Sequence, residues 1–243
     1  MSADGSRVGG RLGRAPTGVG VPRAVLLDAL GTLVGLDEPF ARLALELDGR
    51  GTPIGSGAAR EALLVEMAYY RAHHDEAADP RGLEGLHDRC AEVLRTALPE
   101  PARSLPVREV RAAMLAAIRF QPYPEVPGVL ARLRAGGARL VVVSNWDVSL
   151  HGVLAETGLA PLVDAVLTSA ELGFAKPDKR IFARALELAG VGAAQALHVG
   201  DDVRADARGA RAAGIAAVLV DRDGSLTAPP GVRAVRSLDG LLG

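Results

Sequence analysis

Residues 24–33 read AVLLDALGTL, and this stretch decides how the rest of the chain is interpreted. Four apolar residues follow shortly after Pro22 and end at a carboxylate, Asp28, with a Gly-Thr turn at 31–32. A short apolar run of this kind predicts a buried parallel strand. Asp28 is then expected at the C-terminal end of the strand, the edge at which open α/β sheets bind ligands. A carboxylate there can attack an electrophile or hold a cation.

The second half of the chain alternates between strand and helix patterns. Further strands are predicted at 139–143, 165–167, 196–199 and 216–220, and amphipathic segments of helical length separate most of them. Because these strands are apolar throughout, they predict a parallel sheet with both faces covered by helices. The expected core is therefore a doubly wound α/β fold.

Helical patterns fill the region between the first strand and this alternating half. We expect an inserted, all-helical cap at 36–121, with the α/β core formed by 23–35 and 122–243. Residues 1–22 are rich in Gly and show no periodicity, so a disordered tail is expected there.

Composition argues against several classes of function. The chain has 28 basic and 29 acidic residues, so its net charge of −1 does not favour nucleic acid or an anionic membrane as a partner. No apolar run reaches the ~18–20 residues that a membrane span requires. The first 22 residues lack the apolar segment of a signal peptide, and Cys90 is the single cysteine, so we expect a cytoplasmic protein that acts on a small molecule. Nothing in the sequence indicates the oligomeric state.

Residues that carry chemistry follow the predicted strands. Asp28 follows the first strand, Ser144-Asn145 the second and Asp201-Asp202 the fourth. We expect them to converge, because the C-terminal ends of parallel strands share one edge of the sheet. Carboxylates gathered there would repel one another unless a cation such as Mg²⁺ lay between them. Ser144, Asn145 and the amides that follow could hold an oxyanion.

Lysine is a rare choice in this chain. Only two of the 28 basic residues are lysines, Lys176 and Lys179. Lys176 precedes Pro177 just before a predicted helix, where it could neutralise the same anion as a point charge. A nucleophile, a metal, a hydroxyl, backbone amides and a lysine are together what phosphoryl transfer needs.

Four motifs, in order along the chain, resemble those of the haloacid dehalogenase (HAD) superfamily. Residues 28–33 resemble motif I, 143–145 motif II, 175–178 motif III and 198–214 motif IV. The helical insertion after motif I resembles the cap of subfamily I, which phosphoglycolate phosphatases and 2-haloacid dehalogenases share. The resemblance implies a HAD-like Rossmannoid core with a helical cap.

The resemblance also implies roles for individual residues. Asp28 is the catalytic nucleophile that forms an aspartyl ester, and Ser144 and Lys176 bind the transferring phosphoryl group. The ligands implied for a Mg²⁺ cofactor are Asp28, the backbone carbonyl of Leu30, Asp201 and Asp206. The implied activity is the hydrolysis of a small phosphorylated metabolite.

Leu30 departs from the family's phosphatases, in which an Asp two residues after the nucleophile protonates the leaving group and later activates water. Leucine can do neither, and the loss of such a group costs about 10²–10⁴ in rate. The family's dehalogenases also lack this acid, so 2-haloacid hydrolysis is one alternative and a non-catalytic binding or interaction protein is another. Those dehalogenases also lack a metal carboxylate at the place of Asp201, so Asp201 and Asp206 favour metal-dependent chemistry.

Two groups of histidines have simple interpretations. His198 is interpreted as a core histidine that packs behind the site. The run His73-His74-Asp75-Glu76 is interpreted as a solvated helix end, because adjacent residues on a helix point in different directions. The alternative is a cap histidine that supplies the missing acid.

Overall fold

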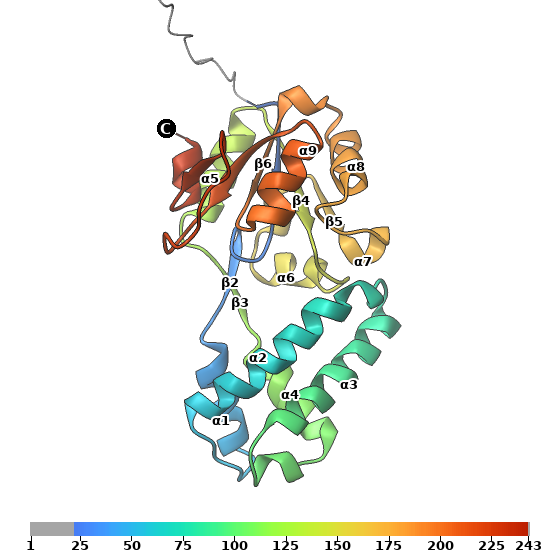
Figure 1. The fold of residues 1–243 in the computed structure, drawn as a ribbon, viewed down its shortest axis with the longest axis vertical. Coiled ribbons are helices and arrows are strands. Elements are labelled where there is room, and N and C mark those ends of the chain that lie inside the picture. The colour runs from blue at the N-terminus through green and yellow to red at the C-terminus, as the bar shows by residue number, and fades with distance from the viewer. Residues whose placement is uncertain (1–21, 243) are drawn as a thin grey trace, which may run out of the picture.

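A computed structural model describes residues 22–242 and contains an α/β core and a helical cap (Figure 1). The predicted tail at 1–22 lies, apart from Pro22, outside the described residues. The core contains a six-stranded sheet in the order β5-β4-β1-β6-β7-β8. Its strands are β1 (Ala24–Leu27), β4 (Arg139–Ser144), β5 (Ala165–Thr168), β6 (Ala196–Gly200), β7 (Ala216–Val220) and β8 (Arg233–Val235).

All neighbouring strands of this sheet run parallel, which confirms the predicted fold class. β1 lies inside the sheet, where Leu27 aligns with Val142 of β4 on one side and Val199 of β6 on the other. The chain crosses from one side of β1 to the other between β5 and β6. The C-terminal end of β1 is therefore a topological switch point, where such sheets form a crevice.

Both faces of the sheet are buried because successive residues of a strand point to opposite faces. Val25 and Leu27 belong to the hydrophobic cluster under α5 and α6, whereas Leu26 packs with Ile181 and Phe182 under α8 and α9. The covering helices are α5 (Val126–Ala135), α6 (Leu150–Glu156), α8 (Lys179–Ala189) and α9 (Gly209–Ala212).

Helix α8 is bounded by two residues that are typical of helix ends. The side chain of Asp178 accepts a hydrogen bond from the backbone N–H of Arg180 (2.9 Å), and Gly190 ends the helix with φ 68°. The segment that follows β6 is not a regular α-helix. It is a π-helical turn at Val203–Arg208 followed by α9, because the carbonyl of Asp202 accepts from both Asp206 (3.0 Å) and Ala207 (3.1 Å).

The cap consists of four helices with a hydrophobic core of their own. Leu43, Leu63, Leu86, Leu94 and Met114 are among its buried side chains, and they form a cluster separate from those of the sheet. The helices are α1 (Pro39–Asp48), α2 (Ser56–His73), α3 (Pro80–Ala97) and α4 (Val107–Ala117).

A two-stranded antiparallel ribbon joins the cap to the core. It consists of β2 (Val34–Leu36) and β3 (Phe120–Pro122), with Val34 paired to Pro122. The boundaries expected between residues 35 and 36 and between 121 and 122 both fall within this ribbon. Neither this ribbon, β8, nor the short helix α7 (Ser169–Leu172) is predicted by the sequence pattern.

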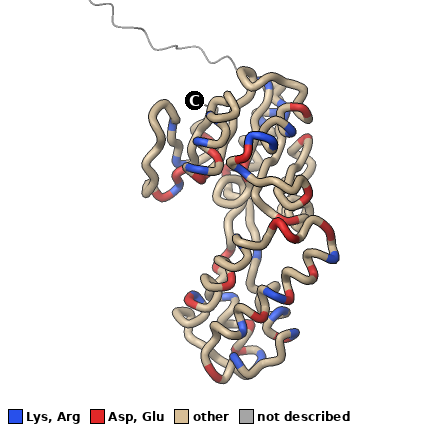
Figure 2. The backbone as a smooth tube through the Cα atoms, turned by 45° about the vertical axis from the view of Figure 1, so that its right-hand side comes forward, with Lys and Arg blue, Asp and Glu red and all other residues tan. Residues whose placement is uncertain are grey.

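Charged residues of both signs are interspersed over the core and the cap (Figure 2). None of the helices in residues 22–242 is long and apolar enough to cross a membrane. The concentration of charge that matters for chemistry lies inside the molecule, at the edge of the sheet.

Candidate active site

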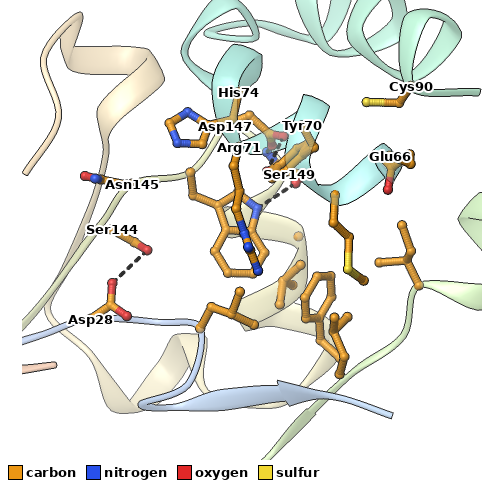
Figure 3. Close-up of a pocket in the computed structure, with 18 of the residues that line it drawn as sticks. Asp28, Glu66, Tyr70, Arg71, His74, Cys90, Ser144, Asn145, Asp147 and Ser149 are labelled. Carbon is orange, nitrogen blue, oxygen red and sulfur yellow. Dashed lines mark hydrogen bonds between the residues drawn. The ribbon is translucent and has the colours of Figure 1, made fainter. Parts of the chain in front are cut away.

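Three of the predicted site residues lie at the ends of neighbouring strands. Asp28 follows β1, Ser144 is the last residue of β4 and Asp201 follows β6. Since β1 pairs with both β4 and β6, these residues meet at the middle of one sheet edge. Figure 3 shows Asp28 and Ser144 side by side on the core side of a cavity, joined by a hydrogen bond.

Lys176 lies between two buried carboxylates. Its Nζ donates to Asp28 Oδ1 (2.5 Å) and to Asp206 Oδ1 (2.6 Å), and the Oγ of Ser144 also donates to Asp28 Oδ1 (3.0 Å). Burial opposes the charge on Lys176, but Asp206 and Asp28 raise its pKa above the ordinary lysine value. Burial in turn raises the pKa of Asp28, even beside this ammonium group. The four side chains form one buried hydrogen-bonded group.

Asp206 is held from behind by the core. Its Oδ1 also contacts Nε2 of His198 (2.9 Å), and its Oδ2 accepts from the backbone N–H of Asp202 (3.0 Å). Burial disfavours its charge, yet Lys176 and His198 keep the pKa of Asp206 well below the usual range. His198 is fully buried, as the sequence predicts. Gly200 leaves the space for this carboxylate, because a Cβ there would lie 2.2 Å from Cγ of Asp206.

Asp28, Asp201 and Asp206 form a cluster that fits a divalent cation. Each offers one carboxylate oxygen, and these oxygens all lie within 4.8 Å of one another. Burial, followed by the charges of Asp28 and Asp206, raises the pKa of Asp201 to about 7. A cation placed among these oxygens would remove their repulsion, and an all-oxygen donor set is what Mg²⁺ prefers.

Gly31 brings the loop after Asp28 against this cluster. Its φ is 78°, and a Cβ at this position would lie 2.0 Å from Oδ2 of Asp201. Both its conformation and its close approach to a carboxylate therefore require glycine. Leu30, which precedes it, is 37% exposed and lines the cavity.

Asn145 lies beside the site, but its side chain is already engaged. Its Nδ2 donates to the carbonyl of Lys176 (2.9 Å), and its Oδ1 accepts from the N–H of Lys176 (2.7 Å). The side chain of Asn145 thus fixes the backbone of Lys176, and its part in holding an anion stays a prediction. Asp202 has a similar structural task, since its Oδ1 accepts from the N–H groups of Arg204 and Ala205 (2.7 and 2.6 Å).

A cavity of about 1080 Å³ separates these core residues from the cap. Tyr70, Arg71 and His74 of the cap line it opposite Asp28, as Figure 3 shows, and Trp146 lines it from the core. The predicted solvated helix end is wrong for His74, whose side chain is 11% exposed and lies against this cavity. Charged residues of the core thus line one side of the site, and residues of α2 and of the segment directly after it line the opposite side.

The family model described as haloacid dehalogenase-like hydrolase matches residues 22–214 of this chain. The chain belongs to this family.

Relatives of this HAD-like hydrolase include enzymes named as phosphatases. It is 36% identical over 227 residues to a phosphoserine phosphatase from Thermus thermophilus, covering 82% of this chain and 89% of that protein. It is 40% identical over 100 residues to a phosphoglycolate phosphatase from Caulobacter vibrioides, covering 41% of this chain and 42% of that protein. The protein is therefore a hydrolase with phosphatase relatives.

Solved structures of both branches expected from the resemblance share its fold. A HAD phosphatase from Thermococcus onnurineus superposes with a TM-score of 0.62 at 25% identity, covering 90% of this chain and 95% of that one. An L-2-haloacid dehalogenase superposes with a TM-score of 0.66 at 26% identity, covering 91% of this chain and 97% of that one. Because a phosphatase and a dehalogenase share this fold, fold similarity does not distinguish phosphate-ester hydrolysis from carbon–halogen hydrolysis. The site residues have to distinguish them.

Arg222 supports the loop after Asp28 in this HAD-like hydrolase, although no sequence motif points to it. It follows β7 and donates to the carbonyls of Gly31 (2.9 Å) and Thr32 (2.7 Å), while a third nitrogen meets Glu125 (2.9 Å). Its guanidinium also stacks over the ring of Tyr123 at 3.3 Å from the centroid. Its position two residues after a predicted strand is the one available signal, because loops after strands line the site.

Proposed function

We propose that this HAD-like hydrolase is a Mg²⁺-dependent phosphatase that acts on a small phosphorylated metabolite through an aspartyl phosphate on Asp28. The observation that carries the proposal is the buried pairing of Lys176 with both Asp28 and Asp206, with Asp201 alongside. A lone carboxylate could attack many electrophiles, but a carboxylate cluster with a lysine suits a doubly charged phosphoryl group. The buried free thiol of Cys90 is consistent with the cytoplasmic location expected from the sequence.

The residues that would hold Mg²⁺ are those expected from the sequence: Asp28, the Leu30 carbonyl, Asp201 and Asp206. When bound, the ion supplies positive charge to the phosphoryl oxygens and removes the repulsion between the carboxylates. Both oxygens of Asp206 already accept hydrogen bonds, so its larger contribution is to hold Lys176 in place. Replacing Leu30 leaves its carbonyl unchanged, since a backbone atom does not depend on the side chain.

The reaction uses side chains that are already in contact. The carboxylate of Asp28 attacks phosphorus, and Ser144 Oγ and Lys176 Nζ turn from Asp28 to the phosphoryl oxygens that arrive beside it. Water then attacks the phosphorus of the aspartyl phosphate, which releases phosphate and restores the carboxylate. The alcohol leaves toward the cap, because the core closes the opposite side.

The test is hydrolysis of p-nitrophenyl phosphate with Mg²⁺ and after metal removal by a chelator. We expect activity that depends on Mg²⁺ and that Asp28→Asn abolishes, because an amide cannot form the phosphoryl ester. Asp202→Asn is the matched control, since its acceptor oxygen is retained and its role is to cap a turn. Activity that survives metal removal, or that survives Asp28→Asn, contradicts the proposal.

Carbon–halogen hydrolysis by Asp28 is the second candidate, and Leu30 is the observation in its favour. That reaction has a halide leaving group, which needs no proton. Release of chloride from 2-chloropropionate by the metal-free protein would support it. Absence of chloride release, together with Mg²⁺-dependent phosphate release, removes it.

A further inference from the structure

The side chain of Leu30 leaves the cavity without a proton donor at the place where the alcohol departs. A phosphatase working on alkyl esters needs one, because an alkoxide is a poor leaving group. Several acidic groups line the cavity, but most are committed elsewhere. The hydroxyl of Tyr70 donates to Asp147 Oδ2 (2.8 Å). Glu66 and Cys90 also line the cavity, but both are almost fully buried, and Figure 3 shows them on the cap side, away from Asp28 and Ser144.

His74 also lines the cavity, and its position is fixed by the docking of the cap on the core. It follows directly on α2, and three contacts hold the segment around it. The first is the Tyr70–Asp147 hydrogen bond, the second runs from the Oγ of Ser169 to Asp75, and the third from the N–H of Val148 to the carbonyl of Ala77 (3.0 Å). The segment 70–77 is therefore held against the loops that follow β4 and β5.

These contacts place the imidazole over the phosphate-binding residues. Figure 3 shows His74 on the cap side of the cavity, above Asn145 and Ser144, with Asp28 below them. An ester whose phosphoryl group lies against Asp28 has to direct its alcohol away from the core and toward the cap. His74 lies on that side, and Leu30 of the core lines the same cavity.

Its neighbour His73 has a different environment. The Nδ1 of His73 contacts the carbonyl of Tyr69 (2.7 Å), and its ring stacks on the ring of Tyr69 at 4.0 Å between centroids. His73 does not line the cavity, so only one histidine of this pair is available to a substrate.

The two nitrogens of His74 are not equivalent. Nδ1 is buried and lies 2.9 Å from Oδ1 of Asp75, but the two atoms do not form a hydrogen bond. The proton that the ring can exchange with the cavity is therefore the one on Nε2. The other ionisable groups around it are Tyr70 and Arg71 on its own segment, Asp147 from the core and His87 on α3.

We propose that His74 is the acid–base residue of this enzyme and replaces the carboxylic acid that Leu30 lacks. The inference rests on the proposed phosphatase function. When Asp28 attacks phosphorus and the bond to the ester oxygen breaks, Nε2 of the imidazolium gives that oxygen its proton, which yields the alcohol and a neutral ring. When water then attacks the aspartyl phosphate, Nε2 takes its proton as the bond to Asp28 breaks. Phosphate leaves, and both residues return to their starting states.

The test compares two esters in wild type and in His74→Gln, with Mg²⁺ present. Glycerol 2-phosphate has an alcohol that must be protonated, whereas p-nitrophenolate leaves without a proton. The ratio kcat/KM reports the steps up to departure of the alcohol, so we expect His74→Gln to lower it about 100-fold for glycerol 2-phosphate. For p-nitrophenyl phosphate we expect little change in kcat/KM but a lower kcat, because hydrolysis of the aspartyl phosphate loses its base. A purely structural role would lower kcat/KM for both esters alike.

His73→Gln is the matched control and is expected to leave both esters unaffected. The double variant Leu30→Asp/His74→Gln tests whether a carboxylic acid at position 30 can replace the imidazole. We expect it to restore much of the lost kcat/KM for glycerol 2-phosphate. Equal losses on both esters, no loss at all, or no rescue by Leu30→Asp in a folded double variant would each overturn the role of His74. If wild type itself fails to hydrolyse either ester with Mg²⁺, the phosphatase proposal fails instead.

Discussion

Gly31 connects the conformation of the loop after Asp28 to the carboxylate cluster of Asp28, Asp201 and Asp206. Two separate properties of this position require glycine: its positive φ, and the lack of space for a Cβ beside Asp201. Only the second concerns function. Gly137 has a similar φ of 85° but nothing within 4 Å of its missing Cβ. Comparing alanine substitutions at Gly31 and Gly137 therefore separates the effect of backbone strain from the effect of displacing a carboxylate.

We predict that Gly31→Ala destabilises the protein and also removes Mg²⁺-dependent activity, because the new methyl group displaces Asp201. Gly137→Ala is expected to cost about 1–2 kcal/mol of unfolding free energy from strain alone and to leave activity unchanged. Urea unfolding gives the stabilities, and calorimetric titration with Mg²⁺ gives the affinities. Wild-type Mg²⁺ affinity in Gly31→Ala would contradict the assignment of Asp201 as a cation ligand.

At the level of single residues, the sequence predicts which side chains meet but not what each one does there. Asp28, Ser144 and Asp201 could be brought together because all of them end predicted strands. The role of Asn145 could not be predicted, because its side-chain amide makes hydrogen bonds to the backbone of Lys176, which is 31 positions away in the sequence. His74 was open to two interpretations, because only the docking of the cap decides which of two adjacent histidines reaches the cavity.

At the level of elements, Arg222 connects its own loop to the loop after β1 and to the segment between β3 and α5. It holds the carbonyls of the loop after β1, the carboxylate of Glu125 before α5 and the ring of Tyr123 after β3. The planar guanidinium makes these contacts at once, which an ammonium group cannot do. The loop that carries Leu30 and Gly31 thus depends on a residue at the opposite end of the chain.

We predict that Arg222→Lys lowers the unfolding free energy by about 1–3 kcal/mol, because buried carbonyls lose their donors. Phosphatase kcat should fall with it, since the loop after Asp28 is no longer fixed. Arg139→Lys is the control, because Arg139 makes an exposed ion pair with Asp164 at the other end of the strands. Thermal unfolding and steady-state kinetics on both variants make the comparison, and equal behaviour of the two variants would contradict this role.

The limits of prediction at this level follow from how each element is stabilised. Long buried runs such as 139–143 and capped helices such as α8 carry their signals locally. The ribbon of β2 and β3 has only three residues per strand, and its pairing joins positions 34 and 122. The π-helical turn depends on one carbonyl accepting two N–H groups, which no periodicity encodes. Elements of this second kind are specified by tertiary contacts.

At the level of the whole molecule, the cap and the sheet have separate hydrophobic clusters, and the cap contains one buried acid. Glu66 on α2 is 2% exposed, and its Oε2 has no hydrogen-bond partner among residues 22–242. Burial raises the pKa of Glu66 from 4.5 to about 7. In the folded protein its proton is therefore retained to a higher pH than in the unfolded chain.

The consequence is that the stability from a protonated Glu66 is fully present below pH 4.5 and is lost as the pH rises through about 7. The loss amounts to about 3 kcal/mol. We predict that Glu66→Gln, which stays neutral, gains about that much stability relative to wild type between pH 4.5 and pH 8. Urea unfolding followed by circular dichroism at the two pH values measures the gain. Glu61→Gln, at an exposed position of the same helix, should show no such gain; an equal gain there would contradict the prediction.

The β2–β3 ribbon has a further consequence for the history of such a molecule. Because Val34 is paired with Pro122, the chain leaves and rejoins the core at a single place, and every strand of the six-stranded sheet lies outside the excursion. A two-residue turn could close the ribbon into a hairpin, or a different insert could take the place of the helices, without altering the strand order. Substitution of one continuous gene segment would then exchange the surface that meets the substrate while the nucleophile and its supporting residues were inherited intact.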